Sequence, residues 1–138
     1  MRRDWTVDVA AMHDKFGMSG KPREFDVGKL RAFLDFRVKF LREELAELSE
    51  AETACQFVDA LIDLCVVAIG TLDLFDVDSH KAWDAVNRAN MAKEAGSNPS
   101  RPNAFGLPDL VKPAGWVAPT HADNVGLLAK LFEKGVVS

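Results

Sequence analysis

Five acidic side chains between residues 43 and 63 have the types and spacing expected of a site for a divalent cation. They are Glu43, Glu44, Glu47, Asp59 and Asp63. At about 100° per residue, a helix would place the three glutamates within an arc of about 100° on one side. Like charges at these spacings repel each other. Solvent or a cation must therefore offset the repulsion.

The two aspartates lie in a segment that is otherwise apolar. They are the only ionised side chains between Phe57 and Leu72, and their spacing of four residues puts them on one face of a helix. A helix that is apolar all round is expected to be buried, and buried carboxylates must be paired, protonated or bound to a metal. No Lys or Arg occurs between Arg42 and Lys81 to pair with them. A hard cation such as Mg²⁺, bound through oxygen atoms, would satisfy both groups of acids.

The pattern of apolar residues predicts the helices that carry these acids. A short helix is expected over Trp5–Phe16, and a long amphipathic helix is expected from an N-cap at Asp26 to Leu48. A short turn with capping-box residues then leads into a third helix, Thr53–Phe75, which contains Gly70 as a point of close packing. A short turn favours an antiparallel pair, which would bring the two groups of acids together.

A fourth helix is expected over Ser79–Lys93, and its last turns read NRANMAK. Asn87, Asn90 and Lys93 follow one another at spacings of three. Two amides and an ammonium in line could hold the phosphates of a polar ligand. The alternative is a polar helix end with a cation near its C-terminus, where the helix dipole favours it.

The remainder of the chain is expected to be an extended arm. Residues 97–120 contain five of the six prolines, which excludes a helix or a central strand, and no run of residues alternates clearly as a strand. The arm also contains apolar residues such as Phe105 and Trp116, too many for a disordered linker. A last short helix is expected over His121–Lys134. We therefore predict a helical domain at 1–96, with an arm at 97–138 that packs on it or on a neighbouring subunit.

Composition and charge limit the function classes. The net charge of −4 argues against a general nucleic-acid surface, and the phosphate-binding patterns GxGxxG and GxxxxGK[ST] are absent. The apolar run at 57–72 is too short and too charged to span a membrane. Cys55 and Cys65 have no spacing typical of a metal or redox motif, and no export segment is visible. We expect a cytoplasmic protein without a membrane or nucleic-acid partner.

Three segments, taken in order, resemble the MazG-like nucleotide pyrophosphohydrolases of the all-α NTP pyrophosphatase superfamily. They read FLREELAELSEA, FVDALIDLCVVAIGTL and AWDAVNRANMAK, and the nearest branch is the one similar to phosphoribosyl-ATP pyrophosphohydrolase. The glutamates match the EExxE motif of the family. Asp63 matches the last position of its ExxD motif, but Ala60 takes the first position and Asp59 stands one residue earlier. Asp59 still lies on the same helical face as Asp63, but its coordination of a metal ion would differ from that of the family's glutamate.

The resemblance implies an all-α antiparallel bundle with a MazG-like four-helix core that is completed by oligomerisation. It also implies hydrolysis of a nucleoside triphosphate, or a related nucleotide, to the monophosphate and pyrophosphate. Mg²⁺, or alternatively Mn²⁺, would be held by carboxylates and substrate phosphates. We predict its ligands to be Glu44, Glu47, Asp59 and Asp63. The candidates for the catalytic base are Glu43 and Glu44, and those for substrate binding are Asn87, Asn90, Lys93, Lys39 and Arg42.

Two alternatives stay open at this point. The substrate could be phosphoribosyl-ATP itself, or the chain could be a non-enzymatic helical module whose acids bind a basic partner. A homodimer or tetramer is expected in either case. The long helix carries two apolar rows, and a chain of this size cannot cover both.

Overall fold

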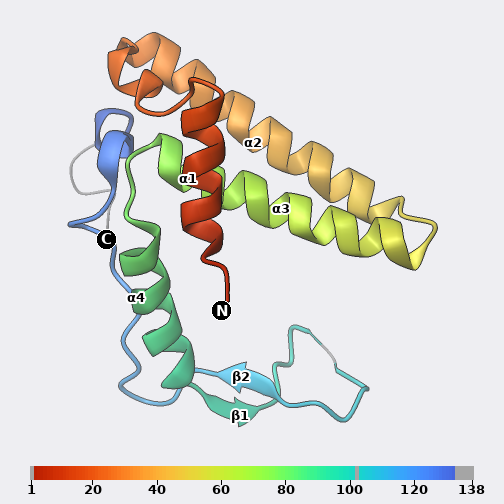
Figure 1. Ribbon diagram of the computed structural model, residues 1–138. Coiled ribbons are helices and arrows are strands. Elements are labelled where there is room, and N and C mark those ends of the chain that lie inside the picture. The colour runs from red at the N-terminus through yellow and green to blue at the C-terminus, as the bar shows by residue number, and fades with distance from the viewer. Residues whose placement is uncertain (1, 102, 133–138) are drawn as a thin grey trace.

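The computed structural model describes residues 2–101 and 103–132, and its main elements are four α-helices (Figure 1). They are α1 (Trp5–Lys15), α2 (Val27–Ser49), α3 (Ala54–Leu74) and α4 (Ser79–Met91). Short 3₁₀ helices occur at Lys21–Glu24 and Gly126–Lys130. Helices dominate this part of the chain and the only sheet found there is very small, so the predicted all-α class is confirmed.

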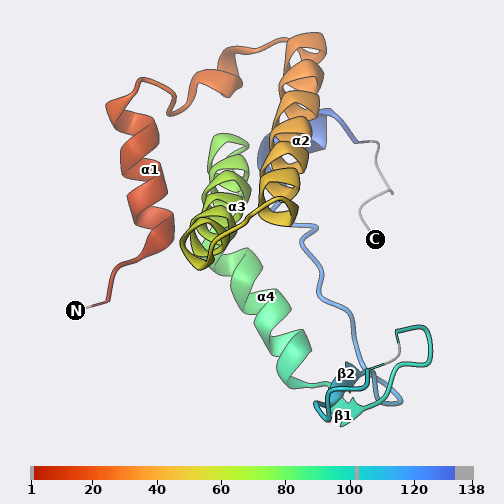
Figure 2. The ribbon, with the colours of Figure 1, turned by 90° about the vertical axis from the view of Figure 1, so that its right-hand side faces the viewer.

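α2 and α3 form the antiparallel pair predicted from the sequence, and α1 packs against α3 (Figures 1 and 2). The Asp26 carboxylate caps α2 by accepting from the Lys29 N–H at 2.8 Å. Thr53 and Gln56 form a capping box at the start of α3. Each helix thus begins at a side chain that satisfies its first N–H groups.

Gly70 allows α1 and α2 to approach α3 closely, as predicted. A Cβ atom at this position would lie 3.0 Å from Nη2 of Arg37 and 3.2 Å from Cε1 of His13. Both of those side chains are buried. Arg37 donates to the Val67 carbonyl at 2.9 Å, and Nδ1 of His13 lies 2.6 Å from Oδ2 of Asp73. Polar side chains of α1 and α2 thus fix the position of both helices on α3.

The end of the arm packs on its own chain. Leu131 is buried with Leu30, Phe75 and Val77 in the hydrophobic core, at the end of α3 that leads into α4. The last predicted helix is a shorter 3₁₀ helix, and residues 133–134 of the predicted range lie outside the described residues. The division into domains at 1–96 and 97–138 stays a prediction.

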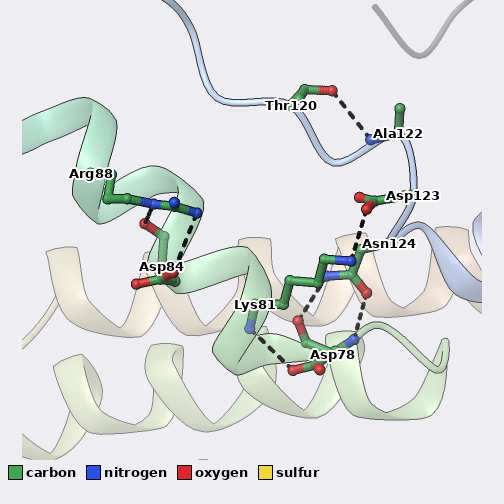
Figure 3. A network of polar contacts seen from close by, with 8 residues as sticks. All are labelled: Asp78, Lys81, Asp84, Arg88, Thr120, Ala122, Asp123 and Asn124. Atoms are coloured by element: carbon green, nitrogen blue, oxygen red, sulfur yellow. Dashed lines mark hydrogen bonds and ion pairs between the residues drawn. The ribbon is translucent and has the colours of Figure 1, made fainter.

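Polar contacts fix the same segment to the start of α4 (Figure 3). The Asn124 amide accepts from the N–H of Asp78 and donates to its carbonyl, both at 2.9 Å. Nζ of Lys81 lies 2.8 Å from Oδ2 of Asp123. These contacts hold the arm where it returns from α4 to the core.

The chain leaves α4 earlier than the sequence predicted. The helix ends at Met91 with Ala92 as its C-cap, so Lys93 lies beyond the helix and does not continue the face of Asn87 and Asn90. The prediction of a helix to Lys93 was wrong at this end.

A short antiparallel hairpin follows, which the sequence did not predict. β1 (Glu94–Gly96) pairs with β2 (Asp109–Val111), and Glu94 faces Val111. Strands of three residues are too short to show an alternating pattern. Gly96 is needed here because a Cβ would lie 2.8 Å from Cγ2 of Val111.

The docking of the arm can be tested at Gly126. Its φ is +53°, and an added Cβ would overlap the Phe75 carbonyl oxygen, which accepts from the Leu127 N–H at 2.8 Å. Gly126→Ala should therefore lower the free energy of unfolding by about 3 kcal/mol in chemical denaturation. Gly115→Ala is the matched control, because Gly115 has a φ of +79° with open space around it. The control should cost only the backbone strain of about 1 kcal/mol. Equal losses in the two variants would contradict the docking.

Candidate metal centre

Three carboxylates from α2 and α3 meet at one point. Glu44 and Glu47 lie near the C-terminal end of α2, and Asp63 lies in the first half of α3. One carboxylate oxygen from each residue can be chosen so that all three lie within 4.8 Å of one another. The antiparallel pairing brings them together, as the sequence predicted for these three residues.

The carboxylate of Glu44 is not fully satisfied by the residues that the structure describes. Its Oε2 atom is buried and has no hydrogen-bond partner among the described residues. Burial raises the pKa of Glu44 above its usual value, and the negative charges of Glu47 and Asp63 raise it further. A buried acceptor without a donor is costly, and so is the approach of three anions. A bound cation would relieve both costs.

The residues fit a hard divalent cation. All three donors are carboxylate oxygens, which Mg²⁺ and Mn²⁺ prefer over nitrogen and sulfur ligands. They are fixed by two helices and open onto solvent on the side of Glu47, which is exposed. Mg²⁺ needs such an opening because it usually keeps several waters or substrate oxygens in its coordination shell.

A hollow of about 260 Å³ adjoins the three acids. It is lined by Glu47, Glu50, Ala51, Gln56, Asp59, Ala60 and Asp63. Asp59 thus lies beside the centre but does not belong to the group of three, and its role as a ligand stays a prediction. Glu50 and Gln56 were not predicted as site residues. Their position between the two acidic groups, at the end of α2 and in the first turn of α3, was the available signal.

The other candidates on α2 are all exposed. Glu43 is close enough for its charge to contribute to the raised pKa of Glu44. Lys39 and Arg42 form no ion pair with any residue that the structure describes. Their roles toward water and phosphate stay predictions.

The candidates on α4 are not brought to the acids within one chain. α4 begins near the C-terminal end of α3 and runs away from the α2–α3 pair in both views (Figures 1 and 2). The acids lie toward the opposite end of α3. Asn87 and Asn90 are exposed on α4, and Lys93 lies past its end.

Comparison with known proteins places this centre in a family. Residues 11–90 match the family described as phosphoribosyl-ATP pyrophosphohydrolase. The match covers more than half of the chain and includes all five acids. The chain belongs to this family. No curated protein and no solved structure matched it.

Membership confirms the resemblance to the all-α NTP pyrophosphatase superfamily, which also holds the MazG-like proteins. The phosphoribosyl-ATP pyrophosphohydrolase family indicates a nucleotide pyrophosphohydrolase, with a nucleotide as substrate. Such enzymes typically depend on a divalent metal, in agreement with the acidic cluster. Within the described residues, no helix is long and apolar enough to cross a membrane.

The electrostatic strain at Glu44 gives a pH-dependent prediction. The pKa of this carboxyl is higher in the folded chain than in the unfolded one, so the folded chain binds the proton more tightly. Without metal, the free energy of unfolding should fall as pH rises from the unfolded-state pKa of Glu44 through its folded-state pKa. It should stay low at higher pH. Glu44→Gln should therefore raise the melting temperature in EDTA at pH 7 and flatten its dependence on pH.

Glu52→Gln is the control, because Glu52 is exposed and lies outside the cluster. It should leave the melting temperature in EDTA unchanged. A melting temperature for Glu44→Gln equal to or below that of the parent chain would show that the carboxylate is not under electrostatic strain.

Proposed function

We propose that this chain is a Mg²⁺-dependent pyrophosphohydrolase that converts a nucleoside triphosphate to the monophosphate and pyrophosphate. The observation that carries the proposal is the meeting of Glu44, Glu47 and Asp63, with one Glu44 oxygen buried and without a hydrogen-bond partner in the described part of the chain. Asp59, which lines the adjoining hollow, is proposed as the fourth ligand. Mn²⁺, with the same preference for oxygen ligands, should substitute for Mg²⁺.

The reaction needs a water molecule directed at the α-phosphorus. The water oxygen forms a bond to this phosphorus while the bond to the oxygen bridging the α- and β-phosphates breaks, and pyrophosphate leaves with that oxygen. Glu43, exposed next to the cluster, is the proposed base that takes the water proton, and Glu44 is the second candidate. When bound, the cation would neutralise charge on the phosphates.

The cations of the chain are proposed to bind the remaining phosphate charge. Lys39 and Arg42 lie within one helical turn of Glu43 on α2, which supports contacts to a nucleotide at the acids. Asn87 and Asn90 could contact the same nucleotide only from a second copy of the chain, since α4 diverges from its own acids.

A homo-oligomer, either a dimer or a tetramer, is therefore part of the proposal. Its support is the apolar surface of α3 that one chain leaves uncovered. The side chains of Phe57, Val58 and Ile62 are 48%, 61% and 44% exposed. Residues of this type next to one another on a helix favour burial against a partner.

The ligand assignment predicts a loss of turnover without a loss of fold. Asp63→Asn removes one of three converging charges and should reduce Mg²⁺-dependent pyrophosphate release at least about 100-fold. Circular dichroism should show unchanged helix content. Asp35→Asn is the matched control, because Asp35 is exposed on α2 outside the cluster and should retain full activity. Turnover retained by Asp63→Asn would reject the assignment.

The family match supports an alternative substrate, phosphoribosyl-ATP, as well as it supports a nucleoside triphosphate. Rates of pyrophosphate release from a panel of canonical and modified nucleoside triphosphates should be compared with the rate from phosphoribosyl-ATP. We expect the higher kcat/KM for a nucleoside triphosphate. A higher value for phosphoribosyl-ATP would replace the proposed substrate and leave the metal centre unaffected.

If the acids served only to bind a basic partner, Mg²⁺ with nucleotide would not raise the melting temperature.

A further inference from the structure

Trp116, from the arm, is held in a fixed orientation at the end of α4. Its Nε1–H donates to the Ala89 carbonyl at 2.8 Å. That carbonyl lies in the last turn of α4, where helical carbonyls have no partner within the helix. The indole thus satisfies a helix end, and this bond fixes its ring against α4.

Two ammonium groups converge on this ring. Nζ of Lys93 lies 5.5 Å and Nζ of Lys112 lies 5.1 Å from a Trp116 ring centroid. The hairpin register ends with the pair Glu94 and Val111, and Lys93 and Lys112 are the next residues, just outside the two strands. Two like charges held near one ring repel each other.

No acid in the described part of the chain forms an ion pair with either lysine. Asp109, the acid of β2, is nearly buried and is paired with Arg101 at 2.8 Å. Two unpaired cations held together on an aromatic ring call for an anion, in a chain whose net charge is negative.

A hollow of about 610 Å³ lies beside the ring, between α4 and residues 113–120 of the arm. Its lining includes Trp116 but neither lysine, and Arg88 at its edge is paired with Asp84 at 3.3 Å. This volume is within the range of small-molecule sites, roughly 300–1,000 Å³. The hollow thus has room for a ring system beside Trp116.

We propose that Trp116, Lys93 and Lys112 form a binding platform for a nucleotide. The base would stack on the half-buried indole, as bases do on aromatic side chains, and the two ammonium groups would hold the phosphates. Lysine side chains are long and flexible enough to turn from the ring to a phosphate. All three residues lie outside residues 11–90, and Trp116 and Lys112 belong to the arm, so this platform is not part of the matched family region.

Titration calorimetry of the full chain with ATP in EDTA tests the proposal. Without a metal ion, the acidic cluster repels phosphates, so binding reports on the platform. We expect the parent chain to bind ATP and the Lys93→Gln/Lys112→Gln double variant to bind it at least about 10-fold more weakly. This variant leaves the Trp116–Ala89 bond in place. Lys15→Gln is the matched control, because Lys15 is an exposed lysine 5.4 Å from the ring centroid of Phe16. It should bind as the parent does.

Two ligand fragments and one further variant complete the test. Inorganic triphosphate, which lacks the base, and adenosine, which lacks phosphates, should each bind more weakly than ATP. Asp63→Asn should bind ATP in EDTA as the parent does, which separates this proposal from the catalytic one. The proposal would be overturned by absent binding in the parent, by unchanged affinity in the lysine double variant, by triphosphate binding as tightly as ATP, or by loss of binding in Asp63→Asn.

Discussion

The repulsion between three carboxylates held within 4.8 Å of one another is the constraint on which the site depends. Desolvation adds to it, because one oxygen of Glu44 is buried without a donor among the residues that the structure describes, and the pKa of this carboxyl is raised. A chain folds around such a cluster only if contacts elsewhere compensate for the cost or if a cation cancels it. Contacts within the α2–α3 pair supply this compensation, and the carboxylate composition of the cluster suits a cation.

The relative position of α2 and α3 decides whether the acids meet at all. A shift of one helical turn, about 5.4 Å, would separate Asp63 from Glu44 and Glu47. Arg37 opposes such a shift because its buried guanidinium bonds the Val67 carbonyl at 2.9 Å and the Thr71 hydroxyl at 3.0 Å. Gly70 leaves room for that guanidinium. A hydrogen-bonded polar contact in the helix interface therefore holds the register that brings the three acids together.

The sequence was sufficient for much of this arrangement because the signals are local. Cap residues such as Asp26 and Thr53 mark where α2 and α3 begin, and the short turn between the helices requires them to be antiparallel. The meeting of Glu44, Glu47 and Asp63 follows from helical spacing once that turn is known. Asp59 shares the face but lies beside the group of three, because helical spacing alone does not say which of two neighbouring acids the register brings nearest.

Other features depend on contacts between distant residues and were not predicted. Helical spacing put Lys93 in line with Asn90, whereas the chain leaves α4 at Met91 and turns into the hairpin. Its neighbours, Lys112 and Trp116, come from the arm about 20 residues later, and the hairpin and the Trp116–Ala89 hydrogen bond bring them together. The burial expected of α3 is also incomplete in the described part of the chain, where Phe57, Val58 and Ile62 stay exposed.

Anomalous X-ray diffraction from crystals grown with Mn²⁺ and a non-hydrolysable nucleotide tests most directly whether the converging acids hold a cation. We expect an anomalous peak about 2.1 Å from carboxylate oxygens of Glu44, Glu47 and Asp63, the distance typical of a small divalent ion bound by oxygen. Nucleotide phosphate oxygens should complete its coordination. A nucleotide bound with no anomalous peak at these residues, or with Mn²⁺ held only elsewhere on the chain, would contradict the proposed metal centre.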